Sequence, residues 1–141
     1  MNKYEIINET KDKINNKNIE DIINKLLATE KLNNTEFNII IVDDTRIKEL
    51  NKQYRSIDEI TDVLSFAFND TSGIIEYERD IIGEVYISFP QAMRQASELD
   101  HTIDDELRWL AVHGLYHLLG YDHIKPEDEK VMRTKEEEIL L

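Results

Sequence analysis

The segment from Thr102 to Leu119 constrains the fold more than any other part of the chain. It predicts a helix with apolar residues on almost every side, and such a helix has to be enclosed by other elements. Gly120 follows directly and is typical of a residue at which a helix ends. We therefore expect a central, buried helix around which the rest of the chain packs. Its apolar positions are Ile103, Leu107, Trp109, Leu110, Ala111, Val112, Leu115, Tyr116, Leu118 and Leu119.

The other segments predict alternating strands and helices. With 141 residues, the chain is long enough for one core and too short for two comfortable ones. We expect an α+β fold in a single domain spanning residues 1–141, with a small mixed sheet of about four strands packed against about five helices. The expected strands are 4–8, 37–42, 63–68 and 81–89, and the further helices are 18–32, one capped by Asp43 or Asp44, one beginning at Pro90 and one beginning at Pro126.

Composition excludes several classes of function. The chain has no cysteine, which rules out disulfides, thiolate metal sites and cysteine nucleophiles. No run approaches the roughly 18 apolar residues of a membrane span, and the N-terminus lacks the apolar region of a secretory signal. We therefore expect a cytoplasmic protein without membrane contact. The formal net charge of −13 repels nucleic acid on average, so that a nucleic-acid role requires a local basic site.

Three of the four histidines lie within residues 113–123. His113 and His117 are four residues apart, which places both imidazoles on one face of the central helix. Gly120 ends the helix, and the following turn can return His123 to the same place. Three histidine nitrogens with an open fourth position are typical of a catalytic zinc site. The alternative is that these are hydrogen-bonded core histidines, which the spacing disfavours.

Gly114 stands inside this helix, where glycine costs about 1 kcal/mol relative to alanine. We expect the close approach of another segment beside it. It also occupies the position at which a metalloprotease of the H-E-x-x-H type has its general-base glutamate, so that peptide hydrolysis by that mechanism is disfavoured. His101, before the helix, has no partner pattern and is expected to be a surface residue.

The segment HGLYHLLGYDH, residues 113–123, resembles without a gap the histidine signature of the YbeY family of bacterial endoribonucleases. The segments LNKQYR, TDVLSF and IGEVYIS occur in the same order as in the family, and the acidic C-terminal helix is similar to the family's last helix. Two positions depart from the family pattern: Ala67 stands where proline is frequent, and Glu84 where aspartate is common. These departures affect the expected strand geometry and not the histidines.

The resemblance implies a metal-dependent, single-strand-specific endoribonuclease. The family acts in maturation of the 3′ end of 16S ribosomal RNA and in ribosome quality control. His113, His117 and His123 would hold one divalent metal ion, with zinc as the first choice, although imidazole suits several metals. Arg55 would lie in the cleft near the metal and be needed for cleavage. The implied partners are ribosomal RNA and the small ribosomal subunit, reached through a ribosomal protein.

The residues themselves leave several roles open. A guanidinium binds phosphate with two parallel hydrogen bonds, which suits Arg55, but a solvated or salt-bridged helix residue is the favoured interpretation without the resemblance. Asp122 could accept a hydrogen bond from a ligand imidazole or stabilise the turn. Ser65 could line the cleft or serve the strand. Glu84 could be a general base, although a solvent-facing strand carboxylate is the simpler interpretation.

Two other functions remain open at this point. One is a noncatalytic ribosome-assembly factor with a structural metal, for which a fourth protein ligand would fill the open position. The other is a metal-dependent hydrolase of a different substrate, such as a peptide or a small ester. The missing glutamate of the H-E-x-x-H motif weighs against the peptide version.

Overall fold

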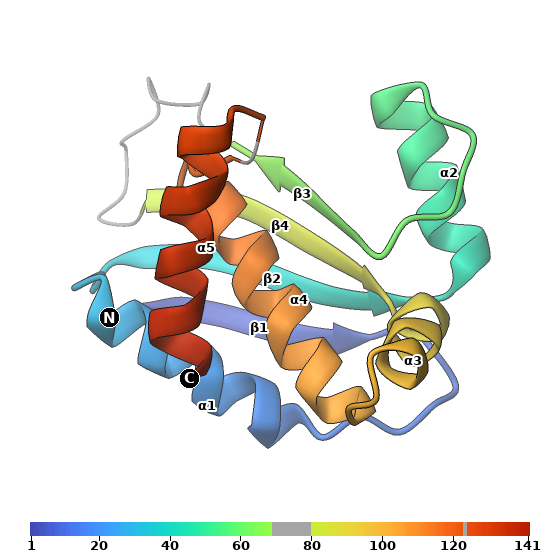
Figure 1. Ribbon diagram of the computed structural model, residues 1–141, viewed down its shortest axis with the longest axis horizontal. Helices are drawn as coiled ribbons and strands as arrows, with labels where there is room; N and C mark the ends of the chain where they lie inside the picture. The colour runs from blue at the N-terminus through green and yellow to red at the C-terminus, as the bar shows by residue number, and fades with distance from the viewer. Residues whose placement is uncertain (69–79, 123) are drawn as a thin grey trace.

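The structure is a computed structural model that describes residues 1–68, 80–122 and 124–141 (Figure 1). Within these ranges the chain forms four strands and five helices. The strands are β1 (Lys3–Asn8), β2 (Thr35–Val42), β3 (Val63–Ala67) and β4 (Asp80–Ser88), and the helices are α1 (Asn16–Thr29), α2 (Asp44–Arg55), α3 (Phe89–Glu98), α4 (Ile103–Leu118) and α5 (Pro126–Leu140).

The four strands form one mixed sheet in the order β1-β2-β4-β3. β2 pairs in parallel with both β1 and β4, whereas β3 is antiparallel to β4. Parallel neighbours require a crossover connection, and α1 forms the one between β1 and β2. The predicted α+β class and the predicted four-stranded mixed sheet are confirmed.

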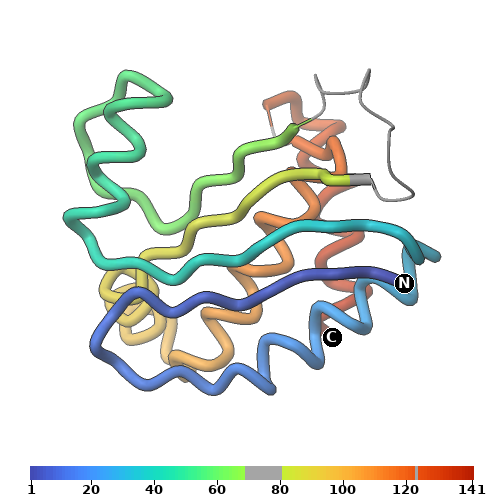
Figure 2. The backbone as a smooth tube through the Cα atoms, turned by 180° about the vertical axis from the view of Figure 1, so that it is seen from behind, coloured from blue at the N-terminus to red at the C-terminus, as the bar shows by residue number. Residues whose placement is uncertain are grey.

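Helices cover the two faces of the sheet unequally. α4, α1 and α5 lie over one face, with α3 at the end of the strands, and α2 packs against the other face (Figures 1 and 2). β2 is buried on both sides: Ile39 and Ile41 contact the core beneath α4, and Ile40 and Val42 contact the core beneath α2. This double burial explains why its sequence is a continuous apolar run rather than an alternating one.

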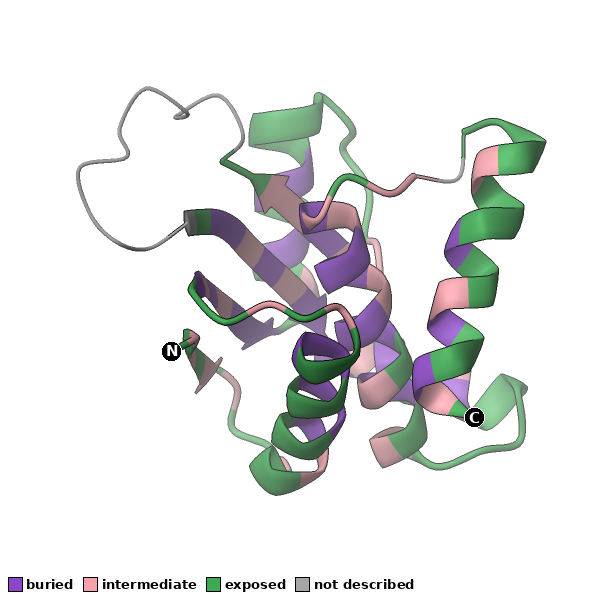
Figure 3. Cartoon of the chain, turned by 90° about the vertical axis from the view of Figure 1, so that its left-hand side faces the viewer, coloured by how far each residue is buried: buried purple, intermediate pink, exposed green. Residues whose placement is uncertain are grey.

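α4 is the central helix that the sequence predicts. It packs against β3, β4, α1, α3 and α5, and its N-terminus is capped by the Thr102 hydroxyl, which accepts a hydrogen bond from the backbone N–H of Asp105. Figure 3 shows buried residues between this helix and the sheet, and exposed residues on the outer sides of α1 and α5. The helix is nevertheless not enclosed on every side, because Trp109 is 37% exposed.

In the described ranges, no helix combines the length and the apolar composition that crossing a membrane requires.

Candidate functional site

The two histidines of α4 face each other at the distance expected of two ligands to one metal ion. Nε2 of His117 lies 3.3 Å from Nε2 of His113, and the two rings are nearly perpendicular, at 82°. Two nitrogens that each lie about 2.0–2.1 Å from a tetrahedral zinc ion are separated by roughly 3.3–3.4 Å. The pair therefore fits one ion without rearrangement of the helix.

The third predicted ligand, His123, lies outside the described residues. Gly120 has a φ of +102°, a left-handed conformation that favours glycine, and the chain leaves the helix there. Among the residues that the structure describes, no group of three or more histidine, cysteine or carboxylate side chains is arranged around one position. The participation of His123 therefore remains a prediction.

Glu136 on α5 orients the first histidine. Its carboxylate Oε2 lies 2.9 Å from Nδ1 of His113, and its side chain is only 6% exposed. An ionised carboxylate accepts hydrogen bonds and cannot donate them. Nδ1–H of His113 therefore donates to Glu136, and Nε2 keeps the lone pair that a metal ion needs.

Sequence reasoning missed Glu136, although the sequence carries a signal for it. Met132, Glu136 and Ile139 are all buried and follow helical spacing along α5. A glutamate in the apolar stripe of an otherwise charged helix indicates a carboxylate with a buried partner, because charged residues are rarely buried unpaired.

Arg55 and His117 line the same pocket, which has a volume of about 710 Å³ and is called the Arg55 pocket below. Nη2 of Arg55 donates a hydrogen bond to the backbone oxygen of Ser65 at 2.7 Å, and its guanidinium carbon lies 5.6 Å from the centre of the Phe66 ring. These two contacts hold the guanidinium against β3. The cation is therefore positioned in the pocket that the second histidine enters.

The other cations of α2 are engaged by carboxylates. Arg46 pairs with Glu49, and Lys48 and Lys52 both lie 4.0 Å from Asp58. Arg55 forms no ion pair within the part of the chain that the structure describes. Its charge is therefore less neutralised than that of its helix neighbours.

Ser65 connects the arginine to the histidine helix. Its backbone oxygen accepts from Arg55, and its hydroxyl donates to the backbone oxygen of Gly114 at 2.9 Å. Asp122 lines the same pocket, and its Oδ1 accepts from the backbone N–H of Ile124 at 3.2 Å. In the described residues this carboxylate thus stabilises the turn after α4.

Glu84 is not brought to the histidines. Val85 faces α4, and successive residues of a strand point to opposite faces, so Glu84 lies on the α2 side of the sheet. Tyr86 shares that side and donates a hydrogen bond to Glu84 at 3.5 Å. Burial and the neighbouring Glu84 raise the pKa of Tyr86, so the phenol stays protonated and donates. The sheet thus separates Glu84 from the histidine pair.

Gly114 allows β3 and β4 to approach the histidine helix closely, as the sequence predicts. A Cβ atom at this position would lie 2.5 Å from Cγ1 of Val85 and 3.2 Å from both Oγ of Ser65 and Cγ2 of Val63. The first of these distances is a steric clash with a core side chain. Glycine is therefore required by the packing between α4 and the sheet.

Replacing Gly114 with alanine is expected to lower the free energy of unfolding by roughly 1–3 kcal/mol, as overpacking does in other cores. Helix propensity alone predicts the opposite sign, a gain of about 1 kcal/mol. Urea unfolding of the variant and of the wild type measures the difference. A stabilised Gly114→Ala variant would contradict the close packing described here.

Comparison with known proteins agrees with this architecture. The sequence profile described as Endoribonuclease YbeY matches residues 5–141. A relative named Endoribonuclease YbeY from Desulforamulus reducens is 46% identical, with 86% of this chain and 82% of the relative covered. A second, from Thermoanaerobacter sp. strain X514, is 40% identical, with 96% and 94% covered.

A solved structure has the same fold. The solution structure of TM1509 from Thermotoga maritima matches with a TM-score of 0.67 and 31% sequence identity, covering 98% of this chain and 87% of that chain. The profile match extends over nearly the whole sequence, and both relatives are covered over more than two thirds of their length. The chain belongs to the YbeY endoribonuclease family.

Proposed function

We propose that this chain is a metal-dependent endoribonuclease that cleaves single-stranded RNA. His113, His117 and His123 hold one divalent metal ion, and Arg55 binds the phosphate at which cleavage occurs. The observation that supports this most strongly is the pair of Nε2 atoms 3.3 Å apart, one of whose rings enters the pocket that also contains Arg55. Membership of a family whose relatives are named endoribonucleases supports the reaction.

A divalent metal ion held by these histidines would supply a Lewis acid and would lower the pKa of a bound water, which could then attack phosphorus. The protein contributes the placement of the phosphate and the stabilisation of its charge. Negative charge grows on the nonbridging oxygens as the phosphodiester is attacked, and a guanidinium donates two parallel hydrogen bonds to such oxygens. The hydrogen bond from Arg55 to the Ser65 backbone fixes this cation before the substrate arrives.

Ribosomal RNA is the proposed substrate, with cleavage at the 3′ end of 16S RNA on the small ribosomal subunit. The net charge of −13 opposes strong unaided binding of RNA, because such binding depends on neutralising phosphates. A ribosomal protein that docks this chain on the subunit would overcome the repulsion. Recognition of the cleavage site would then come from the partner and from the pocket together.

Chelation tests the metal requirement. Wild-type protein freed of contaminating ribonuclease should cleave single-stranded RNA, lose this activity after treatment with a chelator and recover it when zinc or another divalent ion is restored. Failure to cleave any RNA with any divalent metal would overturn the proposed enzyme. It would favour a noncatalytic assembly factor instead.

Substituting Glu136 with alanine is expected to weaken metal binding by roughly 10–100-fold, because His113 loses the acceptor that orients it. Competition with a chromophoric chelator measures the affinity. Glu137→Ala is the matched control, since it removes the same charge from an exposed position on the same helix. Equal affinity of the two variants would show that Glu136 does not position the ligand.

A further inference from the structure

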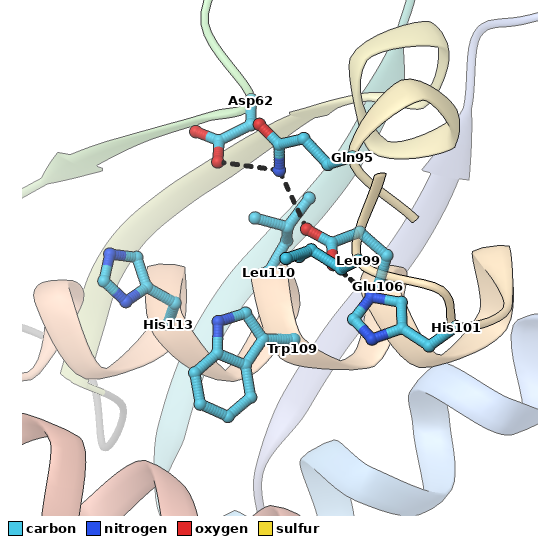
Figure 4. Close-up of a pocket in the computed structure, with 8 residues that line it drawn as sticks. All are labelled: Asp62, Gln95, Leu99, His101, Glu106, Trp109, Leu110 and His113. Carbon is cyan, nitrogen blue, oxygen red and sulfur yellow. Dashed lines mark hydrogen bonds and ion pairs between the residues drawn. The ribbon is translucent and has the colours of Figure 1, made fainter. Parts of the chain in front are cut away.

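A second pocket, of about 550 Å³, borders the same histidine pair (Figure 4). His113 forms part of its wall, as His117 does for the Arg55 pocket. It is called the Trp109 pocket here, after the indole that Figure 4 shows on its lower side. An RNA strand that crosses the candidate metal centre therefore meets two pockets of different chemistry.

Trp109 provides an aromatic surface next to the histidines. It lies on α4 between Glu106 and His113, about one helical turn from each. It remains 37% exposed on a helix that is otherwise largely buried, and its indole N–H makes no hydrogen bond to any residue that the structure describes. Aromatic side chains of this kind stack on the unpaired bases of single-stranded RNA.

A fixed line of polar groups forms another wall of the pocket. Nε2 of Gln95, on α3, donates to Oδ2 of Asp62 at 3.2 Å and to Oε2 of Glu106 at 2.8 Å. Glu106 is only 2% exposed, and its other oxygen lies 2.6 Å from Nε2 of His101. His101 is exposed, as the sequence predicts, but it is also a partner of a buried carboxylate, which the sequence did not indicate. The amide and both carboxylates are held in place before any ligand binds.

The two pockets differ in whether a cation lines them. The residues described around the Trp109 pocket include two carboxylates and neither lysine nor arginine, so the pocket repels phosphate. The Arg55 pocket is also lined by two carboxylates, Glu59 and Asp122, but it contains in addition a guanidinium, which can bind phosphate with two parallel hydrogen bonds. The phosphate backbone is therefore directed to the Arg55 side, and the uncharged base is the part of the nucleotide that the Trp109 pocket can accept.

We propose that the Trp109 pocket is a nucleobase subsite, in which an unpaired base next to the cleaved phosphate stacks on Trp109 and donates its exocyclic amino group to Asp62. The proposal rests on the proposed function and adds a base preference to it. A carboxylate accepts hydrogen bonds and does not donate them. Cytosine, adenine and guanine carry an exocyclic amino group, whereas both exocyclic groups of uracil are carbonyl oxygens, which the carboxylate repels, and only its ring N3–H can donate.

Trp109 is the chain's only tryptophan, so its indole N–H gives a single, assigned signal in a ¹H–¹⁵N NMR spectrum. Metal-loaded protein is titrated with cytidine monophosphate, uridine monophosphate and ribose 5-phosphate, none of which contains a bond that the enzyme can cleave. The cytidine nucleotide should shift the indole signal saturably, the uridine nucleotide should bind several-fold more weakly, and the sugar phosphate should leave the signal in place. An equal response to all three, or no response, would overturn the proposal.

Variants separate stacking from structure. Trp109→Leu should weaken binding of cytidine monophosphate by about 10-fold or more, whereas Trp109→Phe, which keeps an aromatic ring, should lose much less. Asp62→Asn should reduce the preference for cytidine over uridine, because its amide can donate to a carbonyl. Trp109→Leu binding the nucleotide as tightly as wild type would contradict the subsite.

Failure of the nucleobase subsite can be distinguished from failure of the proposed endoribonuclease function. Cleavage of RNA without any response of the indole signal would contradict the proposed subsite but not the proposed endoribonuclease. A base-selective response in a protein that cleaves no RNA would support a nucleotide-binding site and contradict the proposed endoribonuclease.

Discussion

Replacing His117 with alanine is expected to abolish chelator-sensitive RNA cleavage in a protein that remains folded. The variant removes one of two nitrogens that lie 3.3 Å apart. The loss should exceed the roughly 10–100-fold effect of removing an outer partner such as Glu136, because a direct ligand is removed. Single-turnover cleavage and bound metal, measured on the same sample, check the prediction.

Arg108→Ala is the matched control for this variant. This substitution truncates a long side chain on the same helix. Within the described ranges Arg108 pairs with Asp105 across one turn and with no other carboxylate, and it lines neither pocket. Circular dichroism should show comparable unfolding of both variants, since alanine favours a helix. Undiminished cleavage by His117→Ala would contradict the proposed ligand. Loss of cleavage in Arg108→Ala would also contradict it, because the loss would then not be specific to the histidine.

Replacing Arg55 with alanine is expected to lower kcat by about 10²–10³-fold while metal binding is retained. Removal of one group that stabilises transition-state charge has an effect of this size in other enzymes. Arg55→Lys should restore only part of the rate, because an ammonium cannot make two parallel hydrogen bonds to phosphate. Single-turnover rates at saturating RNA, together with the metal content, give the measurement.

Lys52→Ala provides the control for net charge. Lys52 is on the same helix, is 67% exposed and is already paired with Asp58. Its loss changes the formal charge by the same unit but should alter the rate little, because exposed pairs contribute weakly. If Arg55→Ala cleaves RNA as fast as Lys52→Ala does, the guanidinium has no special role. If the Arg55→Ala variant no longer binds the metal, the role of Arg55 is structural.

Local signals in the sequence predicted the elements well. The apolar segment from Thr102 to Leu119 became a helix bounded by Thr102 as its N-cap and by Leu119 as its C-cap. The spacing of His113 and His117 determined their separation, because a helix fixes the positions of residues four apart. These features depend on neighbouring residues alone, which is why they could be predicted.

Features that depend on tertiary contacts could not be predicted in the same way. Glu136 is 23 residues from His113 in sequence, and its acidic helix offers several other carboxylates. The face of Glu84 was undetermined because β4 has apolar residues on both sides, Val85 towards α4 and Tyr86 towards α2. The sequence of a strand buried on both faces does not alternate between apolar and polar residues, so it does not indicate on which face a given side chain lies.

The Trp109 pocket also depends on tertiary contacts that the sequence does not reveal. Trp109 follows the apolar pattern of α4 and was expected to be buried with it, yet it lines a pocket. The hydrogen bonds among Asp62, Gln95 and Glu106 join the start of β3, α3 and α4. No sequence spacing connects these three residues, and only tertiary packing brings α3, α4 and the residue before β3 together.

The central claim is that the histidine pair belongs to a metal site that cleaves RNA. Zinc is titrated into chelator-treated wild-type protein and His117→Ala, and bound metal and RNA cleavage are measured in the same tubes. We predict that in wild type both rise together and saturate at one ion per chain, and that the variant shows neither at these concentrations. Cleavage that persists in metal-free protein, or full metal binding by His117→Ala, would contradict the account.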